Sequence, residues 1–123
     1  MASRTLVNVI LLGFLFGAPT SAQPAYQPKW ENALRASLEA IKEGDCPATL
    51  MAASLRYACK QHLARMSSRL NQLGDIEEIE FEEVEDTPSG PVEWYVVTFD
   101  NGEMFWQVSG NSSGKLVTMW SPP

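Results

Sequence analysis

Residues 92–108 read Val-Glu-Trp-Tyr-Val-Val-Thr-Phe-Asp-Asn-Gly-Glu-Met-Phe-Trp-Gln-Val. The dipeptide Asn101-Gly102 between two β-prone runs predicts a hairpin, because it tolerates positive φ at both corners of a tight turn. Both faces of this hairpin are apolar, since Trp94 and Val96 alternate with residues that are equally apolar. A sheet covered on one side alternates apolar with polar residues. The second face therefore needs a cover of its own, and the nature of that cover bears on function.

The segments on either side of the hairpin predict two helices and two further strands. Apolar residues recur at helical spacing over 29–43, and a longer apolar stripe over 55–73 ends at Gly74. The period then changes to two. Apolar and acidic residues alternate over 79–82, the hairpin follows, and 116–120 is a fourth strand. This order predicts an α+β domain, with helices packed on one face of a curved, four-stranded antiparallel meander sheet.

The only two cysteines, Cys46 and Cys59, constrain the start of the longer helix. In an exported protein an even pair is most simply a disulfide, and the absence of Cys-x-x-Cys spacing argues against the alternative of a reactive thiol pair. On one straight helix their Cα atoms would lie roughly 20 Å apart, whereas a disulfide needs about 4.4–6.8 Å. We therefore expect the helix to break near residues 51–54, with Ser54 as a candidate N-cap.

The N-terminus has the layout of a secretory signal peptide over residues 1–22. Arg4 precedes an apolar run that is shorter than the about 20 residues of a membrane span, and small residues end at Ala22. We expect cleavage after Ala22, a short tail over 23–28 and a single domain over 29–123. The alternative is an uncleaved amphipathic anchor. The cleaved chain would be periplasmic or secreted, without stable membrane anchoring.

Charge is divided unevenly along the expected mature chain. Residues 23–73 carry seven lysines and arginines against four acids, whereas residues 74–123 carry one lysine against eleven acids. The densest acidic run supplies a candidate docking surface of Glu77, Glu78, Glu80, Glu82, Glu83 and Glu85. Such a concentration of negative charge either prevents an edge strand from pairing with another chain or speeds the docking of a basic partner. It argues against nucleic-acid binding, which needs a basic footprint.

Residue types that carry catalysis do not form a recognisable motif in this sequence, and we expect neither enzyme activity nor a cofactor. The single histidine, His62, has no orienting carboxylate nearby in the sequence, and one histidine with two paired cysteines does not make a zinc site. A Gly-x-Ser-x-Gly elbow is absent as well. Should the fold enclose a ligand pocket, the candidate polar groups are Tyr57, His62 and Asp100.

Several residues with structural roles form a pattern that resembles a known group of proteins. They are Leu73-Gly74, Phe81, Tyr95-x-Val97-x-Phe99-x-Asn101-Gly102, Trp106 and Gly114-Lys115-Leu116. The pattern is similar to small exported bacterial domains of the nuclear-transport-factor-two-like superfamily, also described as ketosteroid-isomerase-like or cystatin-like. The resemblance covers about residues 30–121 and implies a conical fold with a pocket between sheet and helix. No isomerase-type acid/base set matches, so catalysis is not carried over.

The resemblance also implies which side chains of the sheet face the helices. The inward set is Tyr95, Val97, Phe99, Met104, Trp106 and Val108. The opposite face, which in this superfamily often packs against a second copy or a partner domain, would show Trp94, Val96, Phe105, Val117 and Trp120. A large exposed apolar patch on a soluble protein usually marks an interaction site. We therefore predict Trp94, Val96, Phe105 and Trp120 as interface residues.

Three functional hypotheses follow from these features. The first is a small exported, non-catalytic protein that uses the outer sheet face to form a homodimer or to bind a protein partner. A narrower form is a periplasmic inhibitor or immunity protein for a basic effector or hydrolase, docked through the acidic run. The third is a small-ligand-binding or isomerase-like pocket protein.

Overall fold

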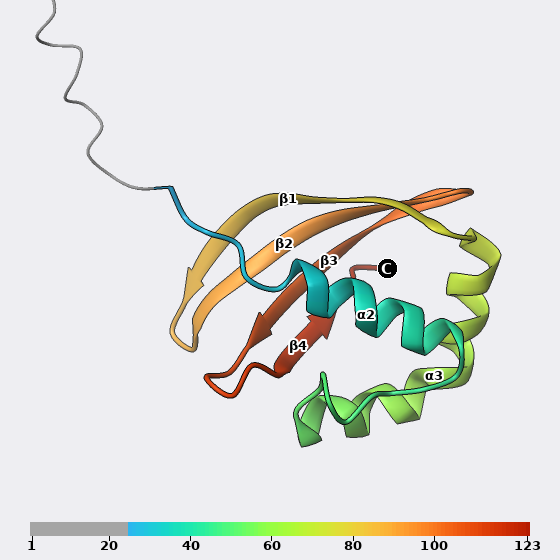
Figure 1. Ribbon diagram of the computed structural model, residues 1–123, viewed down its shortest axis with the longest axis horizontal. Coiled ribbons are helices and arrows are strands. Elements are labelled where there is room, and N and C mark those ends of the chain that lie inside the picture. Colours follow the sequence, from blue (N-terminus) through green and yellow to red (C-terminus); the bar gives the residue numbers. More distant parts are fainter. Residues whose placement is uncertain (1–24) are drawn as a thin grey trace, which may run out of the picture.

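The computed structural model describes residues 25–123, so the expected signal peptide and its cleavage site lie outside the described residues. Two helices precede four strands (Figure 1). The elements are α2 (Glu31–Lys42), α3 (Ala53–Leu73), β1 (Ile76–Thr87), β2 (Gly90–Phe99), β3 (Gly102–Gly110) and β4 (Leu116–Trp120). The strands form one antiparallel meander in the order β1-β2-β3-β4. The predicted α+β class with a four-stranded meander is confirmed. Neither described helix is long and apolar enough to cross a bilayer.

The register of the sheet sorts its side chains into two faces, because cross-strand partners project on the same side. On the inner face, Tyr95 pairs with Phe81 of β1 and with Trp106 of β3. Tyr95 is 0% exposed and Trp106 is 3% exposed. Both belong to the hydrophobic core that also contains the buried leucines of α2. The helices therefore cover the inner face.

The two helices follow the apolar periodicity of the sequence. Leu34, Leu38 and Ile41 of α2 recur on one face and are buried. Helix α3 ends at Gly74, whose φ of 91° lies in the left-handed region that favours glycine. These two helix predictions are confirmed, with small differences at the ends.

The predicted N-cap of the longer helix is wrong. The cap position is Ala52, not Ser54, and its side chain makes no capping hydrogen bond. The start of α3 is set by tertiary contacts instead, because the Ala52 N–H donates to the Leu116 carbonyl at 2.8 Å and the Leu116 N–H donates to the Leu50 carbonyl at 2.8 Å. A short parallel bridge between Met51 and Leu116 thus ties the segment before α3 to β4.

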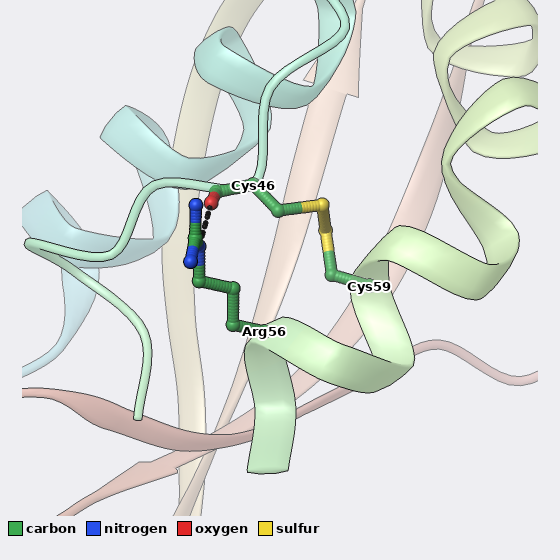
Figure 2. The surroundings of a disulfide bond; sticks show 3 residues. All are labelled: Cys46, Arg56 and Cys59. Atoms are coloured by element: carbon green, nitrogen blue, oxygen red, sulfur yellow. Dashed lines mark hydrogen bonds between the residues drawn. A yellow bond between two sulfur atoms is a disulfide. The ribbon is translucent and has the colours of Figure 1, made fainter. Parts of the chain in front are cut away.

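The disulfide between Cys46 and Cys59 is present, with the two Cα atoms 6.1 Å apart. This distance is reached because the chain turns before Ala53 and brings Cys46 back over the first turns of α3, as the sequence predicts. Figure 2 shows Arg56 of α3 reaching the same segment, where its Nε donates to the Cys46 carbonyl at 2.7 Å. One covalent bond and one hydrogen bond therefore hold this connection against α3.

The segment before α2 is anchored by Glu93 of β2. The Glu93 carboxylate accepts hydrogen bonds from the backbone N–H groups of Lys29 and Trp30, at 2.8 and 3.0 Å. It thereby satisfies donors at the helix N-terminus that would otherwise lack partners. The Trp30 ring lies so close to Gly110 that a Cβ there would be 2.1 Å from it. These contacts fix where α2 begins relative to the sheet.

Candidate interaction surface

The outer face of the sheet carries the aromatic residues that the sequence singles out. Trp94 pairs with Gln107, which pairs with Trp120, and in the next row Val96 pairs with Phe105. Phe105 is 46% exposed and Trp120 is 49% exposed, while Trp94 and Val96 are half-buried. We call Trp94, Val96, Phe105 and Trp120 the outer patch. Both helices lie on the other side of the sheet (Figure 1), so neither helix covers it.

The same face continues onto β1 as a row of carboxylates. The pairing partners of Val92, Trp94, Val96 and Thr98 on β1 are Glu85, Glu83, Glu80 and Glu78. Since paired residues share a face, these four exposed glutamates border the outer patch. We call them the acidic row. The indole Nε1 of Trp94 donates to Glu85 Oε1 at 3.1 Å, which joins the patch to the row.

The other two predicted docking acids lie at irregular positions of β1. Glu77 and Glu82 fall within the two register shifts and have no direct partner on β2. Glu77 lies near the corner of the hairpin, where a hydrogen bond with the side chain of Asp100 and its negative charge raise the pKa of the Glu77 carboxyl. The structure therefore brings four of the six acids together on the outer face.

The three polar residues predicted for a pocket are not brought together. Tyr57 is 67% exposed on α3. His62 is exposed too, and its Nδ1 lies 3.0 Å from Arg65 Nη2. Asp100 packs against Gly74 at the far end of α3, since a Cβ on Gly74 would lie 2.9 Å from it. Twelve residues of helix separate His62 from Gly74, which is about 18 Å. These side chains do not converge on a ligand.

Little space is left between the first half of α3 and the inner face of the sheet. An inner pocket of about 70 Å³ is lined by apolar side chains that include Met51, Met66, Trp106 and Met119. A cavity of about 150 Å³ is needed to hold a molecule of the size of benzene. Methionine and tryptophan side chains thus occupy most of the interior, and the inner pocket alone does not accommodate a substrate.

A buried carboxylate on β2 is the one ionisable group that sequence analysis missed. Glu93 is 0% exposed, and the hydroxyls of Tyr26 and Tyr95 each donate to it at 2.6 Å, in addition to the two backbone bonds. Burial, and then the hydrogen bond to Glu93, raise the pKa of Tyr26 to about 12. The same causes raise the pKa of Tyr95. All four donors hold a structural joint, and the three residues that donate from before α2, Tyr26, Lys29 and Trp30, also line a surface groove of about 600 Å³.

We expect the protein to lose stability as the pH rises from about 10 to 12. The pKa of Tyr26 is about 12 in the folded protein but about 10 for an unperturbed tyrosine. The linked stability is therefore fully present below pH 10 and is lost as the pH rises through 12. Urea unfolding at a series of pH values measures this loss. It should be smaller in Tyr26→Phe and remain above zero, because Tyr95 still titrates with a raised pKa. An unchanged loss in that variant would contradict the assignment.

Within residues 25–123, no three histidine, cysteine or acidic side chains are grouped so that they could hold a metal ion. Comparison of the chain with models of protein families, with functionally described proteins and with solved structures finds no significant match. Among the described residues, the outer patch with its acidic row brings together most of the interface residues and docking acids that the sequence singles out.

Proposed function

We propose that this chain is an exported, non-catalytic interaction protein whose outer sheet face binds a basic protein partner. The observation that carries the proposal is the register of β1 to β4, which places the outer patch beside the acidic row. Exposed aromatic residues at the centre of a surface are typical anchors of protein interfaces. Carboxylates at the rim add attraction to a partner of opposite charge and speed its docking.

Charge favours a different protein over a second copy of this chain. The register places no lysine or arginine on the outer face of the described strands. The strands of a second copy stacked on this face would therefore offer no cation to the acidic row, and Lys29 reaches the face only at the groove that it lines with Val92, Gln107 and Thr118. A partner with lysine or arginine residues around an apolar centre matches both parts of the surface.

Export to the periplasm or the medium is part of this proposal. It is supported by the signal-peptide pattern of residues 1–22 and by the disulfide, which persists in oxidising compartments. An inhibitor or immunity protein for a basic effector or hydrolase is the narrower form, favoured by the acidic row. Membership of the nuclear-transport-factor-two-like superfamily also belongs to the proposal, and the helix–helix–meander order supports it.

Capture from the exported proteins of the source cells tests the proposal, with the folded chain as bait. A basic protein should bind the wild type and be released by high salt. Phe105→Ala/Trp120→Ala should weaken its binding by about 30-fold or more, as expected for anchor residues. Glu80→Gln/Glu83→Gln should weaken it several-fold and reduce the effect of salt.

Matched controls separate the outer face from general effects. Tyr57→Ala removes an exposed aromatic from α3, and Glu39→Gln/Glu43→Gln removes two exposed acids from the region of α2. Both should retain the partner. Equal retention by every variant would contradict the proposal. A wild-type dimer in light scattering that Phe105→Ala/Trp120→Ala converts to a monomer would replace the partner with a second copy.

A further inference from the structure

We propose that a groove between α3 and the β3–β4 end of the sheet binds a small anionic amphiphile, with its apolar chain against methionine side chains and its acid group at two arginines. The groove has a volume of about 440 Å³, and its apolar lining includes Met66, Met104, Trp106 and Met119. This volume falls in the range of sites for small molecules, about 300–1,000 Å³. We call it the methionine groove.

The methionine groove adjoins the inner pocket. His62, Met66, Trp106 and Met119 line both spaces, so the two lie on either side of the same side chains, and a shift of a flexible methionine would join them. At about 70 Å³ the inner pocket has room for the end of an alkyl chain, and the rest of the chain would lie in the groove. Methionine side chains are unbranched and flexible, so they can shift to fit a chain without breaking a hydrogen bond.

Charge selects an anion for this site. The ionisable side chains that line the methionine groove are His62, Arg65 and Arg69, and the C-terminal residue Pro123, which bears the chain-terminal carboxylate, lines it as well, so the two guanidinium groups outnumber the one acid group. In the described part of the chain the one ion pair joins Lys42 to Asp75, so neither arginine is paired with an acid there. The chain as a whole carries a net charge of −6, which makes this positive rim a local feature. Guanidinium groups match the geometry of a carboxylate or phosphate.

The Trp106 side chain gives a second, independent sign that the lining of the methionine groove differs from ordinary core packing. Its indole Nε1 is buried and has no hydrogen-bond partner among the described residues. Buried donors in native proteins are almost always paired. Because the Trp106 side chain lines the groove, the environment of its buried indole N–H changes when a ligand packs against the ring. It therefore serves as a reporter for occupancy of the groove.

Titration with decanoate tests the proposal, with decylammonium as a probe that has the same chain and the opposite charge. Calorimetry should show binding of decanoate and little binding of decylammonium. In amide correlation spectra the Trp106 indole cross-peak should move, while that of Trp94 on the outer face stays. Arg65→Gln/Arg69→Gln should weaken decanoate binding by about 3- to 10-fold, the range for two exposed ion pairs. Arg35→Gln/Lys60→Gln removes the same charge outside the groove and should leave binding unchanged.

Two further experiments identify the source of the ligand and distinguish binding at this site from binding at the outer patch. Flotation with phosphatidylglycerol vesicles, compared with phosphatidylcholine vesicles, distinguishes a lipid from a free acid, and binding of either anion supports the proposal. Trp120 borders both surfaces, so the separating variant is Phe105→Ala, which should retain decanoate binding. Equal affinity for both decyl probes, or no response of Trp106 to decanoate or to anionic vesicles, would overturn it. In either case Arg65→Gln/Arg69→Gln should still capture the basic protein partner, so failure of the decanoate test leaves the proposed function unaffected.

Discussion

Glu93→Ala is expected to lower the free energy of unfolding by about 3–4 kcal/mol, and Tm by roughly 12–32 °C for a domain of about 100 residues. The substitution removes the common acceptor of two tyrosine hydroxyls and two backbone N–H groups. Water can reach the exposed Lys29 N–H, but it cannot replace the carboxylate for Tyr95, which is 0% exposed. A buried donor without an acceptor keeps its full desolvation cost in the folded state.

Glu93→Gln should be milder, with a loss of about 2 kcal/mol. The amide keeps one oxygen, but its NH₂ group must face two donors in place of the second oxygen. A tyrosine hydroxyl can rotate and accept a hydrogen bond, whereas the backbone N–H of Trp30 or Lys29 can only donate. One bond to the start of α2 is therefore lost even in the best arrangement. Thermal and urea unfolding followed by circular dichroism at pH 7 measures both variants.

A double-mutant cycle with Tyr95→Phe assigns the loss to this joint. Because the two side chains share a buried hydrogen bond of 2.6 Å, their combined effect should be smaller than the sum of the single effects by about 1 kcal/mol or more. Glu80→Ala, on the exposed acidic row, is the control and should change stability by less than about 0.5 kcal/mol. If Glu93→Ala were no worse than Glu80→Ala, the carboxylate would not anchor α2.

Part of the role of Glu93 is visible in the sequence. Alternate residues of a strand lie on the same face, so Glu93 shares the inward face with Tyr95, Val97 and Phe99. An acid at an inward position is rarely buried without partners. The partners themselves could not be predicted. Three of the four lie more than 60 residues away in the chain, and two of these three are backbone groups that carry no sequence signal. Only the packing of residues 26–30 on the sheet brings them to Glu93.

Features that arise from local patterns were predictable. The helices follow apolar periodicity, the hairpin follows Asn101-Gly102, and the disulfide follows from two cysteines and the length of a helix. The face of the sheet on which each acid of β1 lies was not predictable from the sequence. Strict alternation would put Glu83 and Glu85 on the same side as Phe81, but a register shift between Phe81 and Glu83 moves them to the outer face. A β-bulge of this kind depends on how two strands pair, and no single residue announces it.

The second large effect concerns the disulfide. Cys46→Ala/Cys59→Ala is expected to lower the free energy of unfolding by about 3 kcal/mol, the value for a closed loop of about 15 residues. That loss corresponds to a fall in Tm of roughly 12–24 °C. Alanine is the suitable replacement because both cysteines are buried, at 2% and 5% exposure, and serine would add an unpaired hydroxyl. Thermal unfolding with and without reductant measures the effect.

The loss should be concentrated in the first half of α3. Cys59 and Leu70 are the two buried residues of this helix, and the one in its first half is held in place by the disulfide itself. Without the disulfide, the first turns keep the bond from Arg56 to the Cys46 carbonyl and the bridge from Met51 to Leu116. Hydrogen exchange should therefore become faster in the first turns of α3 than in β2 and β3.

Reductant provides the control for this prediction, because it should lower Tm of the wild type to the value of the double variant and leave the variant itself unchanged. Arg56→Gln in the reduced protein should loosen the first turns of α3 further, since it removes the remaining bond to the Cys46 segment. Equal Tm values for oxidised and reduced wild type would mean that packing alone holds this half of the helix. A uniform rise in exchange over all elements would mean that the whole loss comes from the unfolded chain, as in the loop-entropy model, and that the disulfide does not additionally hold the first turns of α3.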